Sequence, residues 1–405
     1  MTTEIILNAI PIIALWLLFW LLTLFLRYTG DIKKLLQEPM LKYPVVIFES
    51  DDWGTGPLTQ QAALIQIHEL LSQYSDSTGQ HPVMTLGIIL AEPDVDKIKA
   101  STGQTYHKRT LEDPRYFKLL EVIQKGVDQG TLSVHLHGME HFWPAALMQS
   151  AHDNAQVQQW LFNNKNLQTE DLPSELQSRW VDSSNIPSTE HSKEDIDAAI
   201  DEELSLYAKI FGQAPKTVVP PTFVWTDVVE QAYAARGIET MITPGRQCIG
   251  RDHIRQPKPN GRFFLNGQES EGLLFLVRND YFEPSIGHKA DTVLQRISAK
   301  IQCGRPALLE MHRFNFINSA ADNRMSLQEL DKLLQLISSG LPDVRFISAE
   351  QLAKIMKDHQ RGIASEFIVS SKRLRSKIML ARVKLLLQFD RFAKYSGINF
   401  LLKLV

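Results

Sequence analysis

The chain has 405 residues, of which 44% are hydrophobic and 22% charged, and its formal net charge is −3 at pH 7. This composition is ordinary for a globular protein, and the length suffices for one large core or two smaller ones. The two cysteines, Cys248 and Cys303, exclude a disulfide framework. Neither lies in a thiolate metal motif, so any metal has to bind to histidine and carboxylate side chains.

An almost unbroken apolar run from residue 5 to residue 26 predicts an uncleaved transmembrane anchor over residues 1–30. A bilayer core of about 30 Å needs roughly 20 such residues as a helix. A buried core helix fits less well because the run has no polar face, and a cleaved signal peptide because no basic residue precedes it. The basic residues Arg27, Lys33, Lys34 and Lys42 follow the run. By the positive-inside rule the rest of the chain lies in the cytoplasm, with a periplasmic or extracellular position as the alternative.

After a linker at residues 31–42, strand-like and helical patterns alternate as far as residue 355. Apolar and β-branched runs predict strands at residues 43–48, 83–91, 132–136, 217–219, 240–242, 273–277, 307–311 and 344–347. Helical patterns between them lie at residues 58–74, 115–129, 196–211 and 325–339. Such alternation predicts parallel strands with crossover helices, and therefore an α/β sheet or a (β/α) barrel over residues 43–355.

Two segments fall outside this alternation. Residues 145–190 are polar, rich in Gln and Asn, and predict an insertion beside the active site. Residues 356–405 carry nine Lys or Arg and one acidic residue from residue 372 onward, with apolar residues at near-helical intervals. This pattern predicts a basic amphipathic helix, which either lies on a membrane surface or packs on the protein with a solvated basic face. The basic residues gather in this tail without a nucleic-acid-binding motif, so nucleic acid is not an expected partner.

Nearly all candidate catalytic groups lie in three short stretches, each at the C-terminal end of a predicted strand. The first runs from Glu49 to Gly54 and contains the adjacent carboxylates Asp51 and Asp52. Two carboxylates leaving a buried strand are costly unless a cation or hydrogen-bond donors compensate them. A pair of this kind is by itself more often a loop start or a helix cap, so its meaning depends on the other two stretches.

The second stretch holds three histidines within seven residues, His135, His137 and His141. His137 and His141 share a face if the strand passes into a helical turn, and imidazole is a common ligand of zinc-like ions. His135 points to the same side of the strand as His137, so it is either a supporting residue or a substitute ligand. The pair beside an acidic strand end predicts a divalent metal site, with Zn²⁺ as the expected ion.

The third stretch, residues 308–316, contains His312 and Arg313. One carboxylate and the two imidazoles of the other stretches leave open coordination positions for water, as a hydrolytic metal site requires. The second carboxylate is then expected to act as a general base and His312 as a general acid, while the metal polarises a carbonyl group.

These stretches resemble the motifs of the polysaccharide deacetylase family, the carbohydrate esterases that include chitooligosaccharide and peptidoglycan deacetylases. Asp51 and Asp52 are similar to the paired aspartates of that family, and His312 resembles the histidine of its late Leu-x-His motif. The resemblance implies that Asp51 acts as the base and that His312 protonates the leaving amine. It also implies that Asp52, His137 and His141 bind the metal.

Residues 200–223, which include Pro221, are similar to the family's succession of helix, Gly-x-x-Pro turn, strand and Pro-Pro loop. The resemblance covers about residues 43–350. It implies a distorted (β/α) barrel of the seven-stranded type, which glycoside hydrolases and deacetylases share.

The sequence departs from the family pattern at several places. Trp53 separates the aspartates from a glycine that usually follows them directly, and Val219 stands where the family has the arginine that orients the base. We expect Arg313 or Arg246 to take the place of that arginine, and Asp280 to be the counterpart of a late aspartate. The residues predicted to support the site or to contact the substrate are His135, Trp53, Pro221, Arg313 and Asp280.

The sequence therefore predicts a metal-dependent deacetylase that hydrolyses an N-acetyl (or O-acetyl) group on a membrane-linked carbohydrate, a glycolipid or an exopolysaccharide. The alternative is a catalytically inactive, membrane-tethered glycan-binding or assembly protein with the same barrel. A hydrolase acting on an amide of a small metabolite would share the metal site but would not need the anchor.

Overall fold

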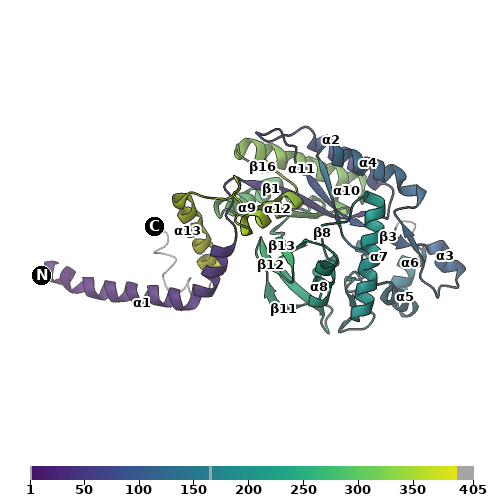
Figure 1. Ribbon diagram of the computed structural model, residues 1–405, viewed down its shortest axis with the longest axis horizontal. Coiled ribbons are helices and arrows are strands. Elements are labelled where there is room, and N and C mark those ends of the chain that lie inside the picture. The colour runs from purple at the N-terminus through teal and green to yellow at the C-terminus, as the bar shows by residue number, and fades with distance from the viewer. Residues whose placement is uncertain (1, 164–166, 390–405) are drawn as a thin grey trace.

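The computed structural model describes residues 2–163 and 167–389 of the chain. A 10-stranded sheet forms its centre (Figure 1). Across the sheet the strands follow in the order β12 (Gln268–Ser270), β13 (Leu273–Val277), β9 (Thr240–Thr243), β8 (Thr217–Val218), β5 (Leu132–Leu136), β2 (Met84–Ile89), β1 (Val45–Gly54), β15 (Ala307–His312) and β14 (Asp280–Tyr281). The strand β16 (Arg345–Phe346) pairs with β1, and every pair of the sheet is parallel except β12 with β13.

The predicted α/β class is confirmed, and each of the predicted strands is present in the sheet or directly beside it. Among the described residues, the edge strands β12 and β14 do not pair with each other. The sheet is thus barrel-like but open, rather than a closed (β/α) barrel of seven strands.

Helices cover the outer face of the sheet. They are α2 (Gln60–Leu71), α4 (Phe117–Asp128), α7 (Lys193–Phe211), α8 (Asp227–Ala235), α9 (Ala290–Gln302) and α11 (Ala320–Gly340). These helices bury the outward side chains of the strands, such as Val46 and Phe48 of β1. The helix α12 (Ala349–Gln360) instead packs against the inward side chains Val45 and Ile47. Outward and inward side chains alternate along β1 because neighbouring residues of a strand point to opposite faces of the sheet.

The inward face of the central strands changes from apolar to polar toward their C-terminal ends. On β1 the inward residue Ile47 is followed by Glu49 and Asp51, all of them buried. The same change occurs on β15 and β13, where inward leucines precede His312 and Arg278. Because the strands are parallel, these polar ends meet at one edge of the sheet.

The predicted insertion contains helices α5 (Pro144–Asp153) and α6 (Ala155–Asn163), which pack with α3 (Val95–Ala100). They share a small hydrophobic core of their own, which includes Phe142, Trp160 and Leu172. The chain continues through the 3-10 turn η2 (Thr169–Asp171) and the short antiparallel strands β6 (Val181–Asp182) and β7 (Thr189–Glu190). These helices therefore share a small core beside the sheet.

Short elements complete the fold. The strand β3 (Ala91–Pro93) pairs with β4 (Lys108–Thr110), and β10 (Arg246–Arg251) pairs with β11 (Pro257–Phe263). The loops hold η1 (Pro114–Tyr116), η3 (Pro221–Phe223), η4 (Pro284–Ile286) and α10 (Phe314–Ile317). The last three follow strands of the sheet and contribute to the edge at which the polar ends meet.

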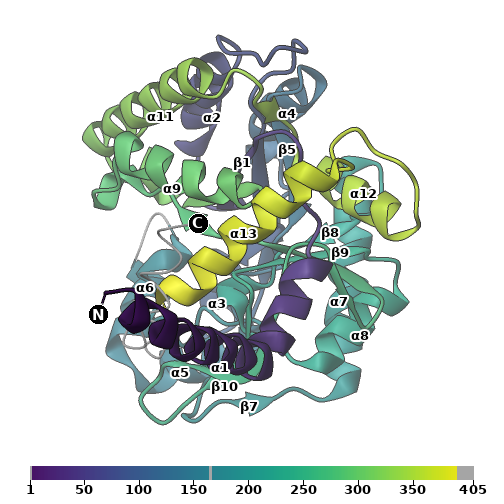
Figure 2. The same cartoon turned by 90° about the vertical axis from the view of Figure 1, so that its left-hand side faces the viewer.

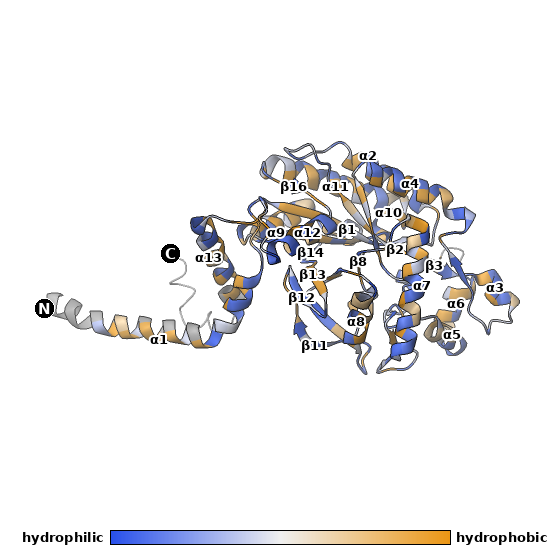
Figure 3. Cartoon of the chain, viewed as in Figure 1, coloured by the Kyte–Doolittle hydropathy of each residue, from blue (hydrophilic) through white to orange (hydrophobic). Residues whose placement is uncertain are grey.

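The helices α1 (Thr2–Gln37) and α13 (Lys372–Phe389) meet at one end of the molecule (Figure 2). Arg382 of α13 is buried, and its nitrogens donate to the carbonyl oxygens of Cys303 at 2.8 Å and of Leu35 at 2.6 Å. Figure 3 shows hydrophilic and hydrophobic residues side by side along α13. The described part of the basic segment is therefore packed on the protein, whereas its predicted remainder at 390–405 lies outside the described residues.

Among the residues that the structure describes, no helix is both long and apolar enough to cross a membrane. A membrane span needs roughly 20 predominantly apolar residues in one helix. The transmembrane anchor over residues 1–30 stays a prediction. The predicted cytoplasmic position of the protein stays a prediction.

Candidate metal centre

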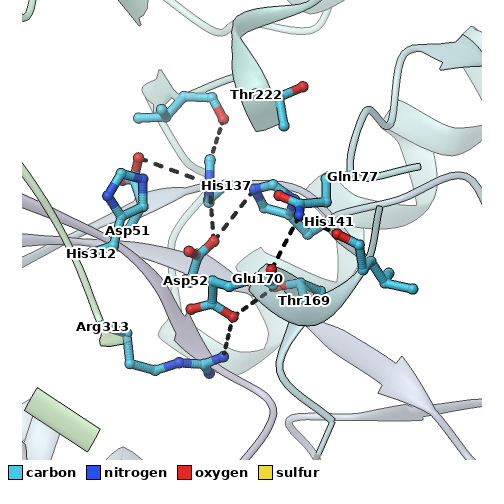
Figure 4. Close-up of polar contacts among 12 residues, drawn as sticks. Asp51, Asp52, His137, His141, Thr169, Glu170, Gln177, Thr222, His312 and Arg313 are labelled. Carbon is cyan, nitrogen blue, oxygen red and sulfur yellow. Dashed lines mark hydrogen bonds and ion pairs between the residues drawn. The ribbon is translucent and has the colours of Figure 1, made fainter. Parts of the chain in front are cut away.

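The structure brings Asp52, His137 and His141 together at the polar edge of the sheet (Figure 4). An oxygen of Asp52 lies 3.5 Å from Nε2 of His137 and 3.4 Å from Nε2 of His141. One ligand atom from each of the three residues lies within 4.8 Å of the others, and all three side chains are buried. This is the set that the sequence predicted as metal ligands.

The chemistry of these three side chains fits a divalent cation. Oδ1 of Asp52 is buried and has no hydrogen-bond partner, which is costly for a carboxylate without a compensating cation. Nδ1 of His137 lies 2.7 Å from the carbonyl oxygen of Val219, and a carbonyl can only accept, so Nδ1 carries the proton and Nε2 offers its lone pair. Burial lowers the pKa of His141 to about 4, which leaves its imidazole neutral, as a ligand has to be.

An irregularity in β1 turns both aspartates toward the site. Neighbouring residues of a regular strand point to opposite faces. Here the register with β2 shifts between Ser50 and Trp53, and Asp52 has a φ of 71°, in the left-handed region that few residues other than glycine adopt. Trp53 itself is fully buried, and its indole N–H donates to Oγ of Ser50 at 2.9 Å. Trp53 therefore supports the core and not the site.

Asp51 is held by Arg278, and not by Arg313 or Arg246 as the sequence led us to expect. Nη2 of Arg278 donates to Oδ1 of Asp51 at 2.8 Å, and Nη1 bonds the other oxygen. Nε of the same guanidinium donates to Glu49 at 2.6 Å. Burial alone would raise the pKa of Asp51, but the charge and hydrogen bonds of Arg278 outweigh it and lower this pKa to about 2.

The other two arginines lie elsewhere. Arg246 is exposed on β10, where its guanidinium lies over the ring of Phe263. Arg313 is buried, and its Nη1 donates to the carbonyl oxygen of Thr55 at 2.8 Å. Both oxygens of Asp51 accept instead from Arg278.

His312 carries a proton because of a residue that the sequence did not single out. Its Nδ1 lies 2.6 Å from Oε1 of Glu283, whose other oxygen accepts from the amide of Asn315. Burial lowers the pKa of His312, but the hydrogen bond and charge of Glu283 outweigh this and raise the pKa to about 10. Asp280, the expected counterpart of the family's late aspartate, instead accepts from Arg296 at 2.7 Å and from Lys300.

Two further buried groups lie beneath this layer. Nε2 of His135 is 3.9 Å from Glu49, and burial lowers the pKa of His135 to about 3, so this histidine is neutral and supports the site from below. Glu310 lies 3.9 Å from Nε2 of His312, and burial raises its pKa to about 7. The position of Glu310 two residues before His312 on β15 is the sequence signal that would have identified it.

The loop that carries the metal-site histidines is supported by buried charges. Glu203 of α7 accepts from the backbone N–H of Met139 at 2.9 Å, and Arg179 donates to Glu140 at 2.8 Å. Pro221 packs beneath the same loop, because a Cβ on Gly138 would lie 3.4 Å from it. Pro221 thus contributes shape rather than a polar contact.

The insertion brings one more carboxylate to the centre, and no motif indicated it. Glu170 lies beside Asp52 and Arg313 in Figure 4, and one of its oxygens is 3.7 Å from Nη2 of Arg313. Burial and the negative charge of Asp52 raise the pKa of Glu170. The centre therefore holds an acidic group supplied by the insertion.

A model of glycosyl hydrolase family 57 matches residues 102–322, more than half of the chain. The chain belongs to this family. The matched span of this family 57 protein contains His137, His141, Arg278 and His312, and begins after the two aspartates of β1. Family 57 is a family of carbohydrate-active enzymes, and at this coarse level the predicted function is confirmed. A search of curated proteins finds no match.

Solved structures similar to this family 57 protein include deacetylases. One is the peptidoglycan deacetylase of Bacillus subtilis, with 12% identity, a TM-score of 0.38, and coverage of 79% of this chain and 95% of that chain. A family 4 carbohydrate esterase from Streptomyces lividans shows 11% identity, a TM-score of 0.33, and coverage of 75% and 90%. The 4-alpha-glucanotransferase of Thermococcus litoralis shows 10% identity, a TM-score of 0.41, and coverage of 78% and 40%. The similar solved structures thus include deacetylases, whereas the matching family model is that of glycosyl hydrolase family 57.

Proposed function

We propose that this family 57 protein is a metal-dependent deacetylase that hydrolyses an N-acetyl (or O-acetyl) group of a carbohydrate. The observation that carries the proposal is the set of groups at one edge of the sheet. Asp51, which is ionised and accepts two hydrogen bonds from Arg278, and a protonated His312 flank three side chains that fit a divalent cation.

Asp52, His137 and His141 would hold the ion, with Zn²⁺ as the expected metal. When bound, the ion would polarise the acyl carbonyl. Asp51 is ionised at neutral pH and fixed by Arg278, so that it accepts a proton from the attacking water. Because Glu283 holds Nδ1 of His312, the proton on Nε2 is the one available to the leaving amine.

The test is the metal content and the acetate release of the purified full chain. We expect about one zinc-like ion per chain and acetate release from an acetylated oligosaccharide. Both should be lost in Asp52→Ala and in His137→Ala, with far-UV circular dichroism unchanged. If the wild-type chain binds no metal after reconstitution, the deacetylase proposal is wrong. A metal-independent glycoside hydrolase or a catalytically inactive glycan-binding protein is then favoured.

The family 57 match and two carboxylates favour one second candidate, a glycoside hydrolase. Such enzymes use one ionised carboxylate and one carboxyl group with a raised pKa, without a metal. Asp51, with a pKa of about 2, and Glu310, with a pKa of about 7, offer such a pair. A chelator separates the two candidates, because it abolishes acetate release by a deacetylase and leaves glycoside hydrolysis intact.

A further inference from the structure

The side chain of Glu170, on η2, lies beside Asp52 and Arg313 in Figure 4. Its Oε1 is buried and has no hydrogen-bond partner. Its Oε2 lies 3.4 Å from Oγ1 of Thr169 and 3.7 Å from Nη2 of Arg313. The proposed mechanism assigns no role to this carboxylate.

Protein groups alone compensate the negative charge of the Glu170 carboxylate poorly. Arg313 is only a distant partner, because its Nη1 is already bonded to the carbonyl of Thr55 and its Nη2 stands 3.7 Å away. The side chain of Glu170 lies beside that of Asp52 in Figure 4. Asp52 also has a buried oxygen without a partner, so two neighbouring carboxylates each expose an unpaired oxygen to the protein interior. Unpaired charges in such surroundings are costly, and a divalent cation would compensate both.

We propose that Glu170 is a fourth acidic group of the metal centre, which strengthens divalent-metal binding from outside the ligand set of Asp52, His137 and His141. The proposal rests on the proposed function. Glu170 stands outside that set because, among the described residues, only those three bring ligand atoms within 4.8 Å of one another. Groups that support the direct ligands of a metal commonly change its affinity about 10- to 100-fold, and we expect the charge of Glu170 to act within that range.

The experiment compares the Zn²⁺ affinity of the full chain with that of Glu170→Gln, by competition with a chromophoric chelator. Glutamine has nearly the same shape as glutamate, so the change removes the charge alone. We expect the dissociation constant to rise about 10- to 100-fold. The matched control is Asp171→Asn, which removes the same charge at the next residue, where the side chain is exposed. Solvent and salt screen an exposed charge, so its dissociation constant should change by no more than about twofold.

Three outcomes are distinct. A Zn²⁺ dissociation constant that is the same in the wild type and in Glu170→Gln overturns the proposal. A wild-type chain that binds no Zn²⁺ overturns the proposed function itself. If Glu170→Gln does not fold, Glu170→Asp keeps the charge on a shorter side chain. Its affinity should stay above that of Glu170→Ala, and equal affinities of these two variants overturn the proposal.

Discussion

Arg278 and Asp51 form a doubly hydrogen-bonded pair although they come from strands that are not neighbours. Arg278 follows β13 and Asp51 lies on β1, and β9, β8, β5 and β2 lie between these strands in the sheet. The guanidinium therefore reaches β1 across the inner side of the curled sheet, and it passes over the ring of Phe223 with its carbon 5.6 Å from the ring centre. The curvature of the sheet is what allows a charge on β13 to orient the base on β1.

Replacement of Arg278 should destabilise the protein strongly. In Arg278→Met the buried carboxylates of Asp51 and Glu49 lose their cation, and loss of one partner of such a group costs about 3–5 kcal/mol. Urea unfolding measures the loss. Arg246→Met removes an exposed guanidinium and should change the free energy of unfolding by less than about 0.5 kcal/mol. Equal effects of the two changes would contradict the role of Arg278.

The same variant should change the acid dependence of stability. Because the pKa of Asp51 is lowered from 3.8 to about 2 in the folded protein, its stabilising contribution is present above pH 3.8 and is lost as the pH falls through about 2. Arg278→Met lacks the guanidinium that lowers the pKa of Asp51. Its free energy of unfolding, measured between pH 2 and pH 5, should therefore not rise with pH as that of the wild type does.

Glu283→Gln should lower the pKa of His312. In the wild type that pKa is raised from 6.5 to about 10, so the contribution to stability is full below pH 6.5 and is lost as the pH rises through about 10. The variant should show a smaller loss of stability over this range, and its activity should decline at a lower pH. An NMR titration of His312 checks the shift directly. Glu269→Gln, at an exposed position of β12, serves as the control.

Gly87→Ala should displace Asp51. A Cβ at Gly87 would lie 2.4 Å from Oδ1 of Asp51, closer than any real contact. We expect kcat to fall about 100-fold, because a small misplacement of a catalytic group has that effect, and the stability to fall by about 1–3 kcal/mol. Gly340→Ala is the matched control, since a Cβ there meets nothing within 4 Å. A wild-type kcat in Gly87→Ala would show that Asp51 is not the base.

Removal of the metal should lower the stability of the wild type and leave that of His141→Ala unchanged. At a Zn²⁺ concentration of 100 times the dissociation constant, binding adds about 2.7 kcal/mol to the free energy of unfolding. Thermal unfolding with and without EDTA measures this difference. His135→Asn should keep the metal-dependent difference, because His135 is not one of the three converging side chains. If His135→Asn loses the difference, His135 is a ligand after all.

The functional groups that the sequence identified correctly lie close to one another along the chain. Asp51 with Asp52, and His137 with His141, lie a few residues apart on strand ends, so their spacing alone indicates a shared site. The parallel order of β1, β5 and β15 was also implied by the alternation of strands and helices, and it brings His312 to the same edge.

The incorrect expectations concern residues whose partners depend on the sheet as a whole. Arg313 lies next to His312 in the sequence, but its side chain turns toward Thr55, whereas Arg278 reaches Asp51 across the inner side of the sheet. Asp280 lies on β14 and turns outward to Arg296 on α9, while Glu283, three residues later, turns toward His312. Spacing along the chain does not tell which side of a strand end a residue faces.

The sequence by itself determined the alternation that makes an α/β sheet and the local pairs of acidic and histidine residues that make a candidate metal site. Tertiary structure alone decided which further charged groups surround them. The curl of the sheet brings Arg278 to Asp51, and the turn after β14 brings Glu283 to His312. The packing of the segment around η2 brings Glu170 to Arg313. The physical reason is that a buried charge is satisfied by whatever group the packed chain brings within a few ångströms, and that distance is set by strand order and curvature rather than by sequence separation.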